Sequence, residues 1–297
     1  MRTRSQFFCT LGMSLLFALI QSCDSAPAPA QECGANSASE PVNATGGCTP
    51  VSMDVNGTLL GPYGTAKLCL GNREYMLQIN EWNSTDKQVL DFGNGYFYKM
   101  TTQQASVATN GGPTGYPSMF IGDNGGRHTA GSGMPKLVSA LTTVPTTWVW
   151  ADNGATDSDT NIYNATYDVW FSTSAAGDPT SYSPSGGFLM VWLHKPSAAQ
   201  PIGGSPKYTA VTIDGIPGTW DVWIGPNGSV PVVSYVRTDI NPAYSMSFDL
   251  NAFIRDAVTH RPGTITDSMY LTNIFAGFEI WSGGVGLQTT AFCAAVN

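Results

Sequence analysis

The sequence predicts an all-β fold in which two antiparallel sheets stack as a sandwich or jelly roll, accompanied by one α-helix. Only 11% of the residues are charged, while glycine (33 residues) and aromatic residues (11%) are abundant. That composition suits short strands joined by tight turns. From about residue 65 onward, alternating apolar and polar segments are separated by Gly, Pro, Asn and Asp. The predicted strands are Tyr75–Asn80, Gly95–Met100, Tyr116–Gly122, Thr147–Trp150, Ala165–Ser172, Gly187–His194, Tyr208–Ile213, Thr219–Ile224, Val230–Arg237, Ser245–Asp249, Met269–Trp281 and Gly286–Val296.

One segment has a helical period instead. Its apolar residues recur at i, i+3 and i+4, and they are Leu250, Phe253, Ile254, Ala257 and Val258. Asp249 precedes the segment as a candidate cap, and the sequence Arg261-Pro-Gly ends it. The strands and this helix together predict two stacked sheets with a concave groove.

The first 22 residues have the pattern of a signal peptide. Arg2 and Arg4 give a basic start, and the apolar run at 11–20 is too short for a mature membrane helix. Two processing sites are open: a lipobox ending at Cys23, which would carry a lipid anchor, or an A-x-A site at 28–30. Both predict an extracytoplasmic protein, either secreted or an outer-surface lipoprotein. Residues 23–50 have a tether composition, rich in Ala, Pro and Ser, so the predicted domain spans 51–297.

Four cysteines remain after processing, and an oxidising compartment favours disulfides between them. Of the three pairings that four cysteines allow, proximity along the chain favours Cys33–Cys48 with Cys69–Cys293. None of them has a metal-ligand spacing and the chain has only three histidines, so neither a metal site nor a cofactor is expected. The net charge of −8 argues against nucleic acid and anionic membrane surfaces as partners. A neutral polymer is a more suitable partner for a surface with so few charges. The protein is expected to be a monomer.

The alternation of side chains in the strand 187–194 separates a core face from a candidate groove face. The aliphatic face, expected in the core, holds Leu189, Val191 and Leu193. The opposite face, expected on the groove floor, holds Phe188, Met190, Trp192 and His194.

Two carboxylates lie in strands that are otherwise aromatic. Asp168 shares a face with Trp170, and Glu279 shares a face with Phe275 and Trp281. A carboxylate in a strand commonly lies on a solvated outer face. Bulky apolar neighbours instead raise a carboxyl pKa by desolvation, which suits a general acid. The chain also contains eight tryptophans, more than a sandwich core is expected to need, and these predict platforms on which sugar rings stack.

Several segments in register resemble glycoside hydrolase family 12, whose members are secreted endo-β-1,4-glucanases and xyloglucanases with a β-jelly-roll fold. The resemblance runs from about Tyr75 to Val296. The motifs that carry it are Gln78-Ile-Asn-Glu-Trp82, Gly115-Tyr-Pro-Ser-Met-Phe-Ile-Gly122, Val144-Pro-Thr-Thr-Trp148, Tyr167-Asp-Val-Trp170, Leu189-Met-Val-Trp-Leu193 with Gln200-Pro-Ile-Gly203, and Ala276-Gly-Phe-Glu-Ile-Trp-Ser-Gly-Gly-Val-Gly-Leu287.

The resemblance implies a role for individual residues. Glu279 falls on the general acid/base of the family, and Asp168 falls on the aspartate that accompanies the nucleophile. The residues expected to bind substrate are Asn80, Trp82, Tyr116, Met190, Trp192 and Trp281.

The sequence departs from the family at the nucleophile. The family has Glu in the motif E-I-M-I-W-L, and Phe188 occupies that position here. Retaining hydrolysis needs two carboxyls about 5–5.5 Å apart, one of which forms a glycosyl-enzyme bond, and a phenyl ring cannot do so. Three hypotheses follow: an inverting hydrolase with Asp168 as base and Glu279 as acid, a non-catalytic β-glucan-binding protein at the cell surface, or a protein acting on another β-linked substrate.

Overall fold

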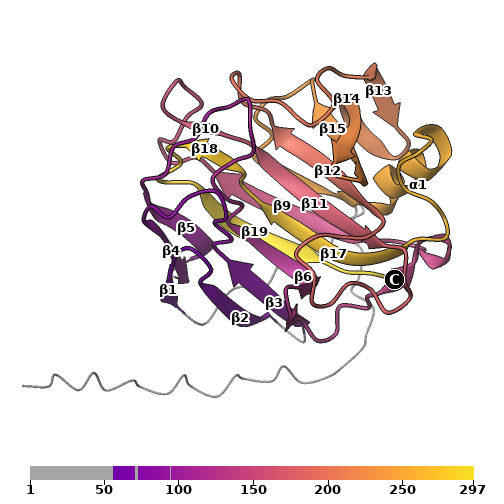
Figure 1. Cartoon of the computed structure of the whole chain (residues 1–297), viewed down its shortest axis with the longest axis horizontal. Coiled ribbons are helices and arrows are strands. Elements are labelled where there is room, and N and C mark those ends of the chain that lie inside the picture. The colour runs from indigo at the N-terminus through magenta and orange to yellow at the C-terminus, as the bar shows by residue number, and fades with distance from the viewer. Residues whose placement is uncertain (1–55, 71–72, 94) are drawn as a thin grey trace, which may run out of the picture. The chain divides into compact units, whose positions relative to one another are not determined.

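The computed structural model describes residues 56–70, 73–93 and 95–297, which form two large sheets, a two-stranded ribbon and one α-helix (Figure 1). The smaller of the two large sheets has six strands in the order β1 (Gly57–Leu60), β4 (Gln88–Gly93), β5 (Tyr96–Gln103), β19 (Gln288–Ala294), β9 (Pro145–Ala151) and β16 (Ser245–Asp249). The ribbon pairs β10 (Ile162–Tyr163) with β18 (Ile280–Ser282).

The large sheet has 11 strands and carries the site described below. Its main path runs through β13 (Tyr208–Ile213), β14 (Ile216–Asn227), β15 (Val230–Arg237), β12 (Gly187–His194), β11 (Ala165–Ser172), β17 (Tyr270–Gly277), β6 (Ser118–Asn124), β3 (Arg73–Gln78) and β2 (Thr65–Leu70). Beside this path, β7 (Arg127–His128) pairs with β6 and β8 (Lys136–Leu137) pairs with β17.

The predicted pairing differs from the structure at one place in the large sheet. All pairs were expected to be antiparallel, but β12 and β15 are parallel. The hairpin of β13 and β14 lies between them in the chain, and β15 pairs antiparallel with β14. The crossover therefore returns β15 in the direction of β12.

Side-chain alternation divides the large sheet into a core face and an open face. Leu189, Val191 and Leu193 are completely buried in the main hydrophobic cluster, as predicted. That cluster joins the two sheets: the Trp148 ring of β9 lies 5.5 Å from the Tyr167 ring of β11, edge to face. Burying a large apolar side chain contributes about 1.5–3 kcal/mol, so the core face holds the sandwich together and leaves the other face free for function.

The helix α1 (Asn251–His260) packs beside β13 and β14 at one edge of the sandwich (Figure 1). Phe253 anchors it, because its ring makes edge-to-face contacts with Trp220 at 4.9 Å and Tyr235 at 5.1 Å. The cap lies one residue later than predicted, at Leu250, which makes no side-chain cap bond. Asp249 still supports the start of the helix, since its Oδ1 accepts a hydrogen bond from the backbone N–H of Asn251 at 3.0 Å.

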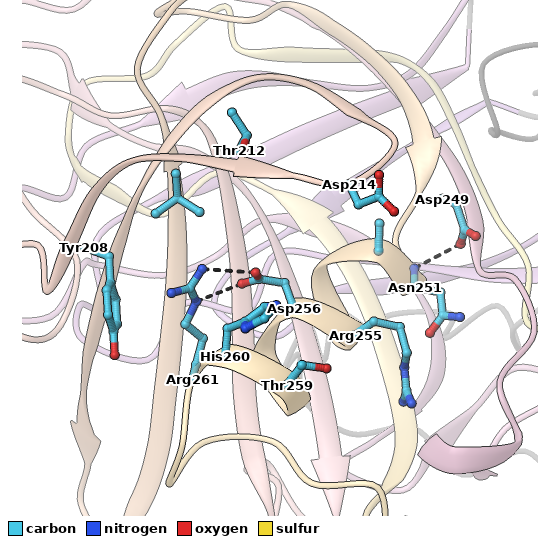
Figure 2. A pocket seen from close by; sticks show the side chains of 12 residues that line it. Tyr208, Thr212, Asp214, Asp249, Asn251, Arg255, Asp256, Thr259, His260 and Arg261 are labelled. Atoms are coloured by element: carbon cyan, nitrogen blue, oxygen red, sulfur yellow. Dashed lines mark hydrogen bonds and ion pairs between the residues drawn. The ribbon is translucent and has the colours of Figure 1, made fainter.

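A buried ion pair fixes the end of α1 against the large sheet. It lies in a hollow of about 820 Å³ between β13 and α1 (Figure 2). Arg261 donates from Nε and Nη2 to the two oxygens of Asp256, at 2.8 and 3.0 Å, and the Tyr235 hydroxyl donates to the same carboxylate at 2.6 Å. The Arg261 guanidinium also lies 4.5 Å from the centre of the Tyr208 ring. Asp256 and Arg261 therefore tie the end of α1 to Tyr235 and Tyr208 of the large sheet.

Asp256→Asn is expected to lower the free energy of unfolding by about 3 kcal/mol, because it leaves the Arg261 charge buried without its counter-charge. The Arg261 and Asp256 side chains are only 7% and 10% exposed. Urea denaturation at pH 7 measures the effect. Asp267→Asn is the matched control, since the ion pair that Arg255 of the same helix forms with Asp267 is 38% and 57% exposed and should contribute less than about 1 kcal/mol. Equal losses in both variants would contradict the anchoring role.

Several predictions fall on residues outside the described ranges, namely the signal peptide, Cys23, the tether, Cys33 and Cys48. Cys69 in β2 and Cys293 in β19 are each disulfide-bonded, and the pairing among the four cysteines stays a prediction. Among the described residues, no helix has the length and apolar character needed to cross a membrane. The same part of the chain holds no group of three or more His, Cys, Asp or Glu side chains placed to bind a metal ion.

Candidate functional site

The strand register lines up side chains from neighbouring strands across the open face of the large sheet. In the central row, Asp168 of β11 pairs with Met190 of β12 on one side and with Phe275 of β17 on the other. One row further along the strands, Trp170 of β11 pairs with Phe188 of β12. These side chains lie opposite the core face because they alternate with buried aliphatic residues.

A cavity of about 730 Å³ lies over this face. It is lined by Tyr63, Asn80, Trp82, Tyr116, Asn124, Asp168, Trp170, Tyr182, Ser183, Phe188, Met190, Asn227, Phe275 and Glu279. Glu279 and Asp168 are thus brought to one cavity, and Phe188 lies in the same cavity.

Glu279 is held by Asn164 through a reciprocal set of hydrogen bonds. The chain leaves β17 at Gly277, so Glu279 stands between β17 and β18, where the backbone N–H of Asn164 donates to its carbonyl at 2.9 Å. The Glu279 backbone N–H donates to Asn164 Oδ1 at 2.9 Å, and Asn164 Nδ2 donates to Glu279 Oε2. Burial raises the pKa of Glu279 to about 7, against the opposing bond from Asn164. The carboxyl therefore keeps its proton until near neutral pH, as a general acid requires.

Asp168 is the second carboxyl with a raised pKa. Burial raises its pKa to about 7, the Trp170 bond opposes this, and the charge of Glu279 adds to the rise. Trp170 Nε1 donates to Asp168 Oδ2 at 2.7 Å, whereas Oδ1 has no hydrogen-bond partner among the described residues. Ionisation of Glu279 therefore favours the protonated form of Asp168. One oxygen of Asp168 is left free to accept a proton or bind a ligand.

Tyr116 lies beside both carboxyls. Its hydroxyl donates to the carbonyl of Thr166 at 2.8 Å. Burial raises the pKa of Tyr116 well above its usual range, and the charges of Asp168 and Glu279 add to this rise. The tyrosine therefore stays neutral and acts as a fixed wall of the cavity.

Aromatic rings form the floor of the cavity. The Trp170 ring lies 5.8 Å from the Phe188 ring, edge to face, and 4.8 Å from the Phe275 ring. Phe275 in turn lies 4.8 Å from Phe120 of β6. Phe188 is 8% exposed, so this chain places a hydrocarbon ring in the floor at that position.

The structure brings four of the six predicted binding residues to the cavity: Asn80, Trp82, Tyr116 and Met190. Trp192 and Trp281 do not line it. They are 2% and 4% exposed and pack in a second apolar cluster with Trp223. Both lie on the predicted face of their strands, but there they pack in a cluster that includes Ala199 and Val107 from segments between strands.

Two further expectations about the groove also change. His194 was expected on the groove face, but the register shifts at Ala165, and the His194 ring lies 5.0 Å from the core residue Tyr163. The tryptophans serve the interior more than the site, since only Trp82 and Trp170 line the cavity. Of the others, Trp148, Trp150, Trp192, Trp220, Trp223 and Trp281 are all buried.

Some lining residues had no signal in the sequence. Tyr182 lies in the segment between β11 and β12, and Asn124 lies at the end of β6. Asn164, which is not itself in the lining, had no signal either. The structure places its side chain, completely buried, against Glu279.

A pH-dependent stability difference follows from the raised pKa of Glu279. Between pH 4.5 and 7 the folded state binds this proton and the unfolded state does not, so raising the pH favours unfolding. Relative to Glu279→Gln, we expect the parent to lose about 2 kcal/mol of unfolding free energy between pH 5 and pH 8. Urea denaturation of both proteins measures this, and His194, whose pKa is lowered by burial, cancels in the difference. A constant difference between the two proteins would show that Glu279 has an ordinary pKa.

Comparison with known proteins agrees with the fold. The family model for glycosyl hydrolase family 12 matches residues 73–297. The probable cellulase Cel12b of Mycobacterium tuberculosis is 34% identical over 167 residues, which cover 56% of this chain and 99% of that protein. The xyloglucan-specific endo-β-1,4-glucanase A of Emericella nidulans is 34% identical over 155 residues, covering 52% of this chain and 58% of that protein.

Solved structures show the same relationship. The endoglucanase Cel12A from Rhodothermus marinus superposes with a TM-score of 0.68 at 31% sequence identity, covering 81% of this chain and 99% of that one. The observed architecture of two large sheets and one helix matches the β-jelly-roll fold of these enzymes. This chain belongs to glycosyl hydrolase family 12.

Proposed function

We propose that this protein hydrolyses internal bonds of β-1,4-glucans, cellulose or xyloglucan, outside the cytoplasm. The observation that carries the proposal is that Glu279 and Asp168, both with a pKa raised to about 7, line one cavity with an aromatic floor. Aromatic rings offer apolar faces to the C–H faces of sugar rings, and the two carboxyls supply an acid and a base.

The chemistry we propose is a single displacement with inversion. Glu279 gives its proton to the glycosidic oxygen as the bond from that oxygen to the anomeric carbon breaks. The oxygen of a water molecule forms the new bond from the opposite face, and the free Oδ1 of Asp168 takes the proton of that water. Solvent then returns a proton to Glu279 and removes one from Asp168. Inverting carboxyls stand about 6.5–9.5 Å apart, which leaves room for this water.

Phe188 is the reason for proposing inversion rather than retention. By resemblance it occupies the position of the family nucleophile, and its ring cannot form a glycosyl-enzyme bond. Asp168 lies one row along the same sheet face from Phe188, and it pairs with Met190 of β12. It therefore takes the role of base in this proposal.

Reducing-sugar release from carboxymethylcellulose, xyloglucan and mixed-linkage glucan tests the activity, and proton NMR of the first products tests the stereochemistry. We expect release from at least one of these glucans, with the α-anomer formed first because inversion converts a β-linkage. Early formation of the β-anomer would contradict the role of Asp168 as base, while leaving the activity itself in place.

A second candidate function is glucan capture without turnover, favoured by the hydrocarbon ring of Phe188 in the cavity floor. In that case the parent and Glu279→Gln release no sugar from any of the three glucans, yet both retain affinity for one of them. Such a result would replace the hydrolase proposal by a binding function.

The location and assembly of the protein are part of the proposal. The basic and apolar start of the chain and its tether composition support export, either as a secreted protein or as an outer-surface lipoprotein with a lipid on Cys23. The disulfide bonds of Cys69 and Cys293 fit an oxidising compartment. We propose that it acts as a monomer.

A further inference from the structure

We propose that Tyr182, together with Asn124, forms a sugar-binding subsite at the end of the cavity away from Trp82. The Tyr182 ring stacks on one β-linked glucosyl ring, and Asn124 Oδ1 accepts a hydrogen bond from one of its hydroxyls. This inference rests on the proposed function, because it requires that a β-glucan occupies the cavity. It adds a residue in a segment that the sequence motifs do not include.

The strand β6 shows that the cavity has two separate aromatic ends. Trp82 lies near the start of β6, since its backbone N–H donates to the carbonyl of Thr114 at 3.2 Å. Tyr182 lies past the other end, against Gly125. β6 has seven residues, so the first and last residues of this strand are about 20 Å apart at the usual rise per residue. Both rings line the same cavity and are 48% and 66% exposed.

The carboxyls lie between these ends. Gly277, two residues before Glu279, pairs with Ser118 at the start of β6. Asp168 belongs to the row of Phe120 in the middle of β6, through Phe275. A glucan that touches both Trp82 and Tyr182 therefore passes over the two carboxyls, which is the arrangement needed to bind sugar units on both sides of the reacting bond.

The segment that carries Tyr182 is fixed to the turn between β6 and β7. The backbone N–H groups of Gly125 and Gly126 donate to the carbonyls of Ser181 and Pro179, both at 2.9 Å. Asp178 accepts hydrogen bonds from the backbone and the hydroxyl of Ser185, both at 3.0 Å. The exposed ring is thus held in place before any ligand binds, which lowers the entropy cost of binding.

Gly125 makes the room for this ring. A Cβ at Gly125 would lie 2.2 Å from the Tyr182 ring, and its φ of +56° is one that Gly and Asn tolerate. At the next residue, Gly126, φ is also positive and a Cβ would meet nothing within 4 Å. The absence of a side chain at Gly125 therefore makes room for the Tyr182 ring, whereas a side chain at Gly126 would not contact the ring.

Asn124 supplies the polar half of the subsite. It is 3% exposed and lines the cavity. Its Nδ2 donates to Gln78 Oε1 at 3.0 Å, which orients the amide, while its Oδ1 has no partner within the described part of the chain. A buried acceptor without a partner costs free energy, and a sugar hydroxyl would satisfy it.

Calorimetric titration with cellohexaose tests the subsite in the Glu279→Gln background, which prevents turnover. Tyr182→Ala should weaken binding about 3- to 10-fold, the value of one aromatic stacking contact, whereas Tyr182→Phe should stay within about 2-fold of the background because the ring remains. Asn124→Leu, which removes the acceptor at similar size, should also weaken binding about 3- to 10-fold.

The two glycines provide a matched pair of variants with the same new side chain. Gly125→Asn should weaken binding as Tyr182→Ala does, because the new Cβ displaces the ring, and Gly126→Asn should bind like the background. Thermal melts identify any variant that fails to fold. If Tyr182→Ala binds as tightly as the background while Trp82→Ala binds more weakly, the subsite is refuted and the proposed function stands. If the background protein binds neither cellohexaose nor xyloglucan, both are refuted.

Discussion

Replacing Glu279 by Gln is expected to lower the rate of glucan hydrolysis at least 100-fold, with little change in glucan affinity. Proton donation by a positioned acid contributes about 10²- to 10⁴-fold, and the amide of Gln has no acidic proton to give. The amide oxygen can still accept the bond that Asn164 Nδ2 donates to Glu279, so the segment between β17 and β18 should keep its place. Reducing-sugar assays and affinity electrophoresis in the same glucan measure both quantities.

Glu81→Gln is the matched control for this variant. Glu81 is completely buried, and burial raises its pKa to about 7, the same value as for Glu279, but it does not line the cavity. The control therefore removes an equivalent buried carboxyl and should keep the parent rate. Equal rate losses in the two variants would mean that Glu279 affects the rate through stability rather than through proton transfer.

Phe188→Glu is expected to raise the hydrolysis rate at least 10-fold and to change the first product from the α- to the β-anomer. A carboxylate at this position can attack the anomeric carbon and form a glycosyl-enzyme, after which Glu279 serves as acid and then as base. The substitution leaves unchanged the neighbouring Trp170 and the pair formed by Asp168 and Met190 in the next row. Proton NMR of the early products distinguishes the two routes.

Phe188→Gln is the control for this change, since it has the size of Glu without the carboxylate and should not gain activity. Both variants should be less stable than the parent by about 2–5 kcal/mol, because each replaces a ring that is 8% exposed by a polar group. A folded Phe188→Glu protein with the parent rate and the parent anomer would show that position 188 does not face the reacting carbon.

The strands of the large sheet that follow the alternation rule were predictable from the sequence. Four of them, β11, β12, β13 and β15, have the predicted bounds, because each is a run rich in apolar, aromatic and β-branched residues of the length of a strand. The predicted strand Met269–Trp281 is interrupted, since β17 ends at Gly277 and β18 begins at Ile280. Strands β1, β2 and β4 were not predicted, and β1 and β2 flank the turn at Gly61–Gly64, where a short strand has little room to show alternation.

The site was predictable only in part, and the two tryptophans of the cluster around Trp223 show why. The pattern assigned Trp192 and Trp281 to the correct face of their strands, yet both are covered there. Whether a face is open depends on elements from elsewhere in the chain. The same holds for Tyr182 and Asn164, which reach the cavity and Glu279 through contacts with distant residues.

The sequence by itself determined which side chains share a strand face, which residues carry the family motifs, and that Phe188 stands where a carboxylate would be expected. These are local properties, because a period of two depends only on the neighbours along the strand. Only the tertiary structure decided that Asn164 holds Glu279, that Asp168 keeps one oxygen free, and that burial raises both carboxyl pKa values to about 7. Those properties arise from groups far apart in the chain that exclude water together, and no local pattern specifies which groups those are.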